Sequence, residues 1–233
     1  MTRGPRTIGV IGGMGPEATI LLQNKVLHTV SAQDDSDHIP LIIDMNPQVP
    51  SRIAYLVDGK GEDPGPTLVA MARRLQAAGC AALAMPCNTA HYFADAITEA
   101  THIPLLNMID LAAKYARQQV VKGGCVGILA SPAVRQARLF ERALEADGIS
   151  VIWPDRDAEM LAAIRRIKAD GPVQEARSAL LQASSDLVAA GAALQFIACS
   201  EFSLISQSVA PDAQAVDTVD LLAQAIVDFS NSG

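Results

Sequence analysis

The sequence contains few of the residues that define several common classes of protein. Only four of its 233 residues are cysteine, Lys and Arg together number 18 against 25 Asp and Glu, and aromatic residues make up 4%. Four scattered cysteines and no recognisable export signal favour free thiols in a reducing cytoplasm over a disulfide framework. The net charge of −7, with no basic run, argues against a nucleic-acid-binding protein and against one that binds anionic membranes.

Long apolar runs are also missing. Gly, Pro or a charged residue interrupts every apolar stretch well before the ~18 residues that a membrane-spanning helix needs, so we expect no such helix. Hydrophobic residues nevertheless make up 50% of the chain, which is enough to bury a core without a disulfide or a metal ion. At ~150 residues per domain, the length predicts one large domain or two small ones.

Short β-branched runs alternate with helical segments along the chain. Strands that alternate with helices of ten or more residues form βαβ units, in which a parallel sheet is covered on both faces. The sequence therefore predicts an α/β protein with mostly parallel sheets. We predict strands at 7–12, 39–45, 81–85, 124–129, 149–153 and 193–197, a loop at 46–66, and helices at 67–78, 88–100, 158–168, 173–190 and 219–229 and from Pro16 and Pro132.

One arrangement of residues occurs twice. Ala77-Ala78-Gly79 is followed by an apolar strand and then by Cys87, and Ala189-Ala190-Gly191 is followed at the same spacing by Cys199. This is either a chance similarity between two βα units or a duplication that produced two α/β halves. In both copies the cysteine lies where a strand passes into a helix, and in parallel sheets that edge binds ligands.

A pair of thiols at such junctions is suited to stereochemical inversion at an acidic carbon. A helix N-terminus favours the thiolate form of a nearby cysteine. One thiolate then removes the α-proton from one face of an amino acid, and the opposite thiol delivers a proton to the other face. This chemistry needs neither a metal ion nor an organic cofactor if hydrogen-bond donors hold the developing charge. Asn88, Thr89 and Ser200 are positioned in the sequence to bind the α-carboxylate.

Six segments of the chain resemble the aspartate racemase branch of the aspartate/glutamate racemase family. They are 9–19, 39–52, 59–66, 85–93 (MPCNTAHYF), 103–110 and 164–171. The resemblance implies two pseudo-symmetric three-layer α/β/α domains, an active site in the cleft between them, no cofactor, and a homodimer. We expect residues 1–110 to form the first domain, with 213–233 packing back on it, and residues 111–212 to form the second.

The resemblance also implies roles for individual residues. Cys87 and Cys199 would be the acid–base thiols, and the substrate would be a small acidic amino acid, either aspartate or glutamate. No metal ligand is implied. The substrate-binding residues would be Asn88, Thr89 and Ser200 for the α-carboxylate and amino group, Arg52 and Lys168 for the distal carboxylate, and Met14 and Asn46 as the lining of the pocket.

The chain departs from the family pattern at two places. Ala198-Cys199-Ser200-Glu201 replaces the usual Gly-Cys-Thr-Glu, a change that keeps the hydroxyl donor. Residues 131–135 (SPAVR) replace a Thr/Ser-rich turn that usually helps to shape the pocket. The identity of the preferred amino acid therefore stays open.

Several alternative functions compete with this interpretation. Residues 13–18 fit a loose dinucleotide-binding pattern, although Pro16 lies within it and a tight turn is the simpler interpretation. Cys87 and His91 have a spacing also found in thiolate–imidazole hydrolases and metal sites, but no second Cys/His pair follows. A protein that only binds an acidic metabolite, and a racemase of another amino acid or of a hydantoin, are the remaining alternatives.

Overall fold

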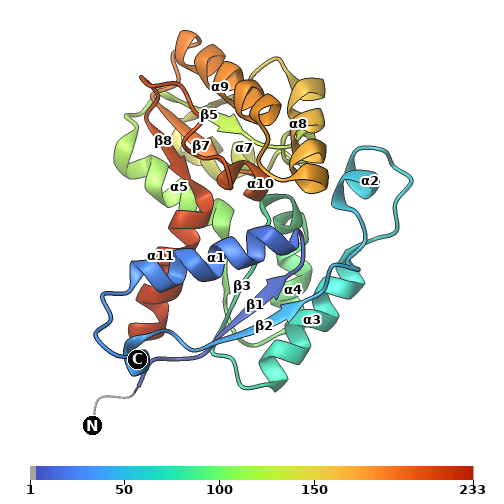
Figure 1. Cartoon of the computed structure of the whole chain (residues 1–233), viewed down its shortest axis with the longest axis vertical. Helices are drawn as coiled ribbons and strands as arrows, with labels where there is room; N and C mark the ends of the chain where they lie inside the picture. The colour runs from blue at the N-terminus through green and yellow to red at the C-terminus, as the bar shows by residue number, and fades with distance from the viewer. Residues whose placement is uncertain (1–3, 233) are drawn as a thin grey trace. The chain divides into compact units, whose positions relative to one another are not determined.

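The computed structural model describes residues 4–232, which fold as two compact units. Unit 1 ends at Met108 and resumes at Val219, and unit 2 is Ile109–Thr218. Each unit contains one four-stranded sheet in which all strands are parallel, with helices packed against it (Figure 1). The α/β class and the parallel sheets predicted from the sequence are confirmed.

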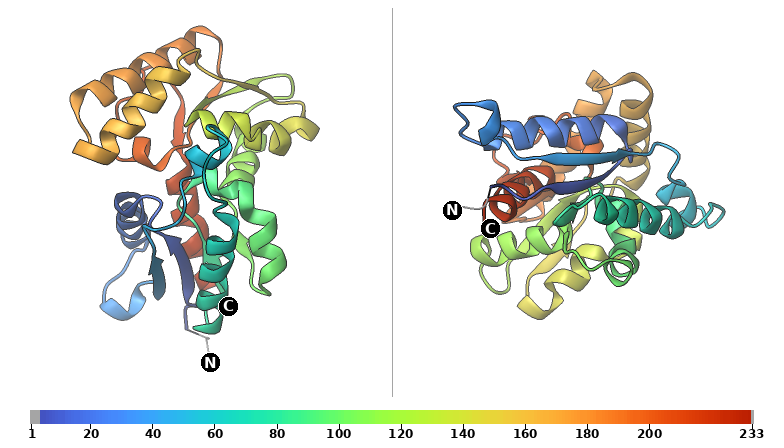
Figure 2. Two further views of the ribbon diagram at one scale, coloured as in Figure 1. Left: turned by 90° about the vertical axis from the view of Figure 1, so that its right-hand side faces the viewer. Right: turned by 90° about the horizontal axis from the view of Figure 1, so that it is seen from below.

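The sheet of unit 1 has the strand order β2-β1-β3-β4. Every residue of its central strand β1 (Ile8–Gly12) is buried, as expected for a strand that is covered on both faces. Helices α1 (Pro16–Thr29) and α3 (Gly65–Ala77) lie on opposite sides of strands β1 and β2 (Figure 2). The sides differ because the right-handed crossover from β1 to β2, which contains α1, and the one from β2 to β3, which contains α3, run in opposite directions along the sheet. The other strands are β2 (Leu41–Met45), β3 (Ala82–Ala84) and β4 (Leu105–Leu106).

The sheet of unit 2 has the equivalent order β6-β5-β7-β8. Its strands are β5 (Cys125–Leu129), β6 (Ser150–Ile152), β7 (Leu194–Ile197) and β8 (Ala215–Asp217). Because β8 pairs with β7, residues 213–218 belong to unit 2. The sequence predicted instead that all of 213–233 packs on the first domain.

The sequence repeat corresponds to a structural repeat. The strand pairs Ile8↔Ala82 and Val10↔Ala84 in unit 1 match Val126↔Leu194 and Ile128↔Phe196 in unit 2. In both copies the preceding helix stops at a left-handed glycine, Gly79 at φ 87° and Gly191 at φ 84°, which is the usual helix C-terminus. The same turn, strand and register in both units favour duplication over chance similarity.

The remaining helices are between 3 and 16 residues long. None of the helices within residues 4–232 combines the length and the hydropathy that crossing a membrane requires. These helices are η1 (Asp35–Asp37), α2 (Arg52–Leu56), η2 (Asn88–Phe93), α4 (Ala94–Ala100), α5 (Met108–Gln119), α6 (Pro132–Gln136), α7 (Leu139–Leu144), η3 (Glu145–Asp147), α8 (Asp157–Asp170), α9 (Gln174–Ala189), α10 (Ser200–Ser203) and α11 (Thr218–Asn231).

Three predicted elements differ from the structure. The loop predicted at 46–66 contains α2, whose first turn is capped by Ser51 Oγ, which accepts a hydrogen bond from the Ala54 N–H at 3.2 Å. The helix predicted from Asn88 begins as the 3₁₀ helix η2, and Cys87 rather than Asn88 occupies its N-cap. The helix from Pro132 is divided into α6 and α7 because Arg138 adopts a left-handed backbone conformation.

The turn after β1 provides a test of how tightly the edge of the first sheet is packed. Gly13 has φ 93°, and a Cβ atom there would lie 2.4 Å from the carbonyl carbon and oxygen of Asn46. Gly79 has a similar φ of 87°, but a Cβ atom added there would meet nothing within 4 Å. We expect Gly79→Ala to lower the free energy of unfolding by about 1 kcal/mol, from backbone strain alone.

We expect Gly13→Ala to lower the free energy of unfolding by about 3 kcal/mol or more, because the overlap of the new Cβ atom with the Asn46 backbone adds to the strain. Urea denaturation of the two variants measures the difference. Equal losses for both variants would show that the turn can move away from Asn46.

Candidate active site

In unit 1, the loops that follow β1 and β2 are joined at the carboxyl edge of the sheet. The Asn46 N–H donates to the Gly12 carbonyl at 3.3 Å, and the Gly13 N–H donates to Thr19 Oγ1 at 3.0 Å. Because the Gly13 N–H is taken up inside the turn, it is not a free donor for a phosphate, which argues against the dinucleotide alternative. Met14, in the same turn, is almost fully buried.

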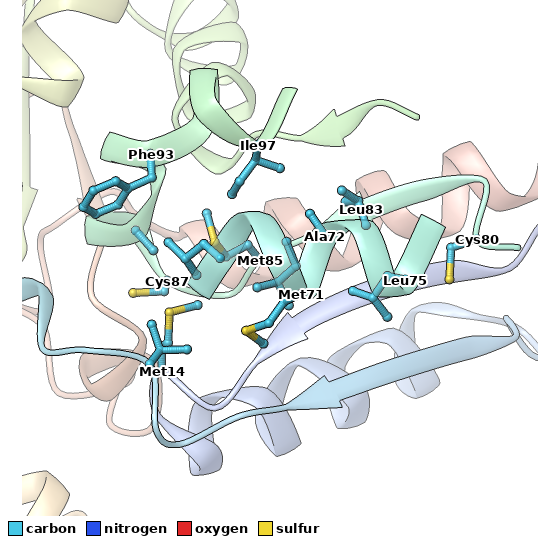
Figure 3. Close-up of a cluster of buried hydrophobic side chains, with 14 residues drawn as sticks. Met14, Met71, Ala72, Leu75, Cys80, Leu83, Met85, Cys87, Phe93 and Ile97 are labelled. Carbon is cyan, nitrogen blue, oxygen red and sulfur yellow. The ribbon is translucent and has the colours of Figure 1, made fainter. Parts of the chain in front are cut away.

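Cys87 lies at the same edge, three residues beyond the end of β3 at Ala84. It occupies the N-cap of η2 with extended backbone angles, and 7% of its surface is exposed. It belongs to a buried cluster with Met14 and Met71, and Figure 3 shows Cys87 and Met14 at one end of this cluster and Cys80 at the other. Asn46 reaches the same cluster, since its Nδ2 lies 3.8 Å from Met71 Sδ.

The residues directly after Cys87 form the first turn of η2. Asn88 is buried, and Thr89 is half-buried. Both residues interact with other groups of the chain. Their role in binding the α-carboxylate stays a prediction.

Arg52 stands at the start of α2 in the loop that follows Asn46. Its Nη1 donates to the carbonyls of Val49 at 3.3 Å and Pro50 at 3.0 Å, and its buried Nε has no hydrogen-bond partner within residues 4–232. Those contacts fix the guanidinium without neutralising it. Arg52 thus carries a positive charge that no carboxylate of the described residues offsets by an ion pair.

His91 holds the turn that carries Cys87. Its Nδ1 lies 2.9 Å from the Cys87 carbonyl oxygen and donates to it, and its Nε2 accepts a hydrogen bond from the Met108 N–H at 3.1 Å. Complete burial lowers the pKa of His91 from 6.5 to about 4, so the ring is neutral at physiological pH. Both ring nitrogens bind backbone groups, which identifies His91 as a structural residue and not as the base of a hydrolase.

In unit 2, Cys199 occupies the position that corresponds to Cys87. It is the N-cap of α10, follows β7, and is also 7% exposed. Ser200, the first residue of α10, is buried. Cys199 Sγ lies 3.0 Å from Glu201 Oε2, and the other oxygen of Glu201, Oε1, lies 3.2 Å from Lys168 Nζ at the end of α8. Cys199, Glu201 and Lys168 form a connected row, which we call the thiol–carboxylate–ammonium triad.

The electrostatics of this triad differ from the sequence-based expectation. Burial raises the pKa of Cys199 well above 9.0, and the charge of Glu201 and its side-chain hydrogen bond with the thiol raise it further. The backbone N–H of Glu201 and, to a smaller extent, the charge of Lys168 lower this pKa. The first-turn N–H of Glu201 acts in the expected direction, but burial and the Glu201 carboxylate outweigh it, so the expected net lowering of the Cys199 pKa is wrong. One four-residue helical turn cannot offset a buried carboxylate in contact with the sulfur. At neutral pH, Cys199 is a protonated thiol that donates to Glu201.

The other two cysteines lie away from these edges. Cys80 is at the amino end of β3 beside Gly9, and burial raises the pKa of its thiol. Cys125 begins β5, and its Sγ donates to the Gly191 carbonyl at 3.1 Å. No group of three or more His, Cys, Asp or Glu side chains within residues 4–232 has the arrangement of a metal site.

The sequence-based list of site residues omitted Glu201. The signal was its position two residues after Cys199, where an acid in the first helical turn can reach back to the N-cap side chain. Its burial beside the thiol comes from the tertiary structure. Of the predicted residues, Met14, Asn46, Arg52, Cys87, Asn88 and Thr89 lie at or near the carboxyl edge of the first sheet, and Cys199, Ser200 and Lys168 lie together in unit 2.

Known proteins resemble this chain along most of its length. A family model described as Asp/Glu/hydantoin racemase matches residues 11–226. The chain is 24% identical over 228 residues to the broad specificity amino-acid racemase RacX of Bacillus subtilis, covering 94% of this chain and 96% of that protein. These matches confirm the family resemblance found in the sequence.

Solved structures show the same fold. The aspartate racemase of Picrophilus torridus superposes with a TM-score of 0.86 at 24% identity, covering 97% of this chain and 94% of that one. A glutamate racemase from Francisella tularensis, in complex with D-glutamate, superposes with a TM-score of 0.68 at 14% identity, covering 96% and 80%.

The depressed pKa of His91 predicts a pH-dependent stability. The unfolded chain takes up a proton at this residue below pH 6.5, whereas the folded protein does so only near pH 4. The contribution of neutral His91 is therefore complete above pH 6.5 and is lost as the pH falls from 6.5 to 4, by up to about 3 kcal/mol. We expect His91→Gln to show a smaller loss of unfolding free energy over this range than the wild type.

Chemical denaturation at a series of pH values measures this difference. His102→Gln, at an exposed histidine, is the matched control and should keep the wild-type pH dependence. A His91→Gln variant with an unchanged slope would contradict the neutral, buried state of His91.

Proposed function

Because the chain belongs to the Asp/Glu/hydantoin racemase family and is an amino-acid racemase of that family, we propose that it inverts the α-carbon of an acidic amino acid by proton transfer between Cys87 and Cys199. The observation that carries this proposal is the repeated placement of one buried cysteine at the N-cap that follows a strand near the centre of each sheet. When segment 77–87 is aligned with segment 189–199, no titratable side chain other than this cysteine occurs at the same position in both.

The proposed reaction moves one proton at each thiol. The Cys87 thiolate takes the proton from Cα, and the carbanion takes a proton from the Cys199 thiol on its opposite face. Cys87 ends as a thiol and Cys199 as a thiolate, and the reverse reaction exchanges these roles. Proton exchange with solvent restores the starting state. Because the two sites share one proton, they titrate as a coupled pair.

Hydrogen-bond donors are proposed to hold the substrate during this step. The first-turn N–H groups and the side chains of Asn88, Thr89 and Ser200 would bind the α-carboxylate and stabilise the charge that develops on the α-carbon. All the chemistry is then supplied by side chains of this protein, so the proposed mechanism requires neither a metal ion nor pyridoxal phosphate. The family resemblance also supports a cytoplasmic location and a homodimer. Light scattering of the purified protein would test the oligomeric state.

Arg52 supports an acidic substrate. Its guanidinium is fixed by two backbone carbonyls and has no ion-pair partner among the described residues, so it can form a charge-assisted pair with a distal carboxylate. We propose that Arg52 recognises aspartate or glutamate, with Met14 and Asn46 lining that side of the pocket.

Lys168 supports a second candidate, a racemase with less preference for acidic amino acids. Its ammonium pairs with Glu201, which offsets the positive charge that was expected to bind the distal carboxylate. Of these two predicted residues, Arg52 alone then keeps a charge that no carboxylate of residues 4–232 offsets by an ion pair. A relative, RacX of Bacillus subtilis, is described as a racemase of broad specificity.

Replacing either cysteine with serine tests the two-thiol mechanism. A hydroxyl is a much weaker base than a thiolate near neutral pH, so we expect Cys87→Ser and Cys199→Ser each to reduce racemisation by about 10²- to 10⁴-fold. Each variant keeps one thiol on one face of the substrate and should exchange solvent deuterium into the α-position of one enantiomer only. Chiral chromatography and proton NMR measure the two activities.

The Cys125→Ser variant is the matched control, because Cys125 contacts only a backbone carbonyl and should leave racemisation unchanged. The assays should also be repeated after treatment with a metal chelator and with a carbonyl reagent that consumes pyridoxal phosphate. Full turnover by either cysteine variant, or equal exchange of both enantiomers, would contradict the two-thiol mechanism. Loss of wild-type activity after treatment with the chelator or the carbonyl reagent would point to a cofactor.

Arg52→Ala tests the choice of substrate. Losing one charge-assisted pair should lower kcat/KM for aspartate and glutamate by about 10- to 100-fold while changing that for alanine much less. Arg73→Ala, at an exposed arginine on α3, removes the same charge and is the control. The same proportional loss for acidic and neutral amino acids would remove Arg52 from substrate recognition and favour the broader-specificity candidate.

A further inference from the structure

Glu201 has a buried carboxylate that the proposed reaction does not use directly. Only 10% of its side chain is exposed, and its two oxygens face different partners, the Cys199 thiol at 3.0 Å and the Lys168 ammonium at 3.2 Å. Buried carboxylates are costly unless they are paired and hydrogen-bonded. Both oxygens of Glu201 meet that condition, and one of them does so through the sulfur that is proposed to react.

The hydrogen bond between Cys199 and Glu201 has a defined direction. An ionised carboxylate can only accept, so the proton lies on sulfur, and the thiol must donate. Were Cys199 to become a thiolate, two negative atoms would lie 3.0 Å apart in a buried environment, and the hydrogen bond would be lost. Lys168 limits this repulsion but touches the far oxygen of Glu201 and is itself 43% exposed.

Other charged groups near this position are already bonded elsewhere. On the adjacent strand, Asp217 accepts a hydrogen bond from Ser203 Oγ of α10 at 2.7 Å. On α9, Arg177 donates to Ser208 Oγ at 3.3 Å. The remaining neighbours of Cys199 in its buried cluster are apolar, among them Leu129, Ile167 and Phe202. Within unit 2, Glu201 and Lys168 are therefore the charged groups that act on this thiol.

We propose that Glu201 is a positioning residue that keeps Cys199 protonated and oriented through the Sγ–H···Oε2 hydrogen bond, with Lys168 fixing the carboxylate from its other oxygen. This inference rests on the proposed racemase function for its catalytic consequence. In the resting enzyme, unit 2 then supplies the proton donor, and Cys87 is left to act as the base. The proton that Cys199 gives to the carbanion leaves a thiolate, and a proton from solvent restores the thiol.

The direct test measures the ionisation of Cys199 without relying on activity. Thiolate absorbance in the ultraviolet is followed against pH for the wild type and for Glu201→Gln, and the curve of the matching Cys199→Ser protein is subtracted from each. Glutamine keeps an oxygen acceptor but removes the charge. Because a like charge in contact shifts a pKa by at least about one unit, we expect about tenfold more thiolate at Cys199 in Glu201→Gln at any pH below both midpoints.

Two further variants make the test specific. Lys168→Met removes the opposing cation and should shift the midpoint of Cys199 the other way, to higher pH. Glu175→Gln removes a carboxylate from the exposed first turn of α9 and should give the wild-type curve. If Glu201→Gln does not fold, Glu201→Asp, which retracts the carboxylate from the sulfur, should still lower the midpoint.

Kinetics then distinguish the inference from the proposed function. For an active racemase, the alkaline limb of the pH profile of kcat/KM should move to lower pH in Glu201→Gln, because the doubly ionised thiol pair forms earlier. Identical titration curves for Cys199 in the wild type and in Glu201→Gln would overturn the role of Glu201, whatever the activity. A shifted curve in a protein that racemises no amino acid would support the role of Glu201 and overturn the racemase proposal instead.

Discussion

The structure depends on a constraint that parallel sheets impose. Strands that run in one direction end at one edge, so every loop that follows a strand emerges there, and its first helical N–H groups face outward at the same edge. In unit 1 this brings together the turn that holds Met14, the loop of Asn46, and the N-cap at Cys87, three segments that are distant in sequence. In unit 2 the same constraint places Cys199 and the end of β8 side by side. The topology of each sheet therefore decides which segments of the chain meet at its carboxyl edge.

The two copies of this arrangement have become chemically different. Both cysteines are N-caps with similar burial, but their immediate surroundings are not the same. The carbonyl of Cys87 is held by a neutral, buried histidine, whereas the sulfur of Cys199 donates to a carboxylate that is paired with a lysine. A racemase needs one acid and one base in each turnover, and a symmetric pair of sites would not assign these roles. The different neighbours of the two thiols offer a physical reason for such an assignment.

Several features could be predicted from the sequence because they depend on neighbouring residues. The alternation of apolar strands and helices, the glycine stops at Gly79 and Gly191, and the equivalent positions of Cys87 and Cys199 are all visible as local patterns. The short strands β4 and β8 were not predicted, and α2 was missed because one serine cap within a loop rich in Pro and Gly is a weak signal. The pKa direction of Cys199 was wrong because it was inferred from the helix terminus alone, and desolvation and Glu201 outweigh that effect.

By itself, the sequence determined the α/β class, the family, and the two cysteines that recur at equivalent positions, because periodicity and spacing are properties of consecutive residues. Only the tertiary structure decided the environment of each group: that His91 is neutral and structural, that Lys168 is paired with Glu201, and that Arg52 has no carboxylate to offset its charge among the described residues. The physical reason is that burial and the proximity of charges set protonation states, and both arise from segments that meet only when the chain folds.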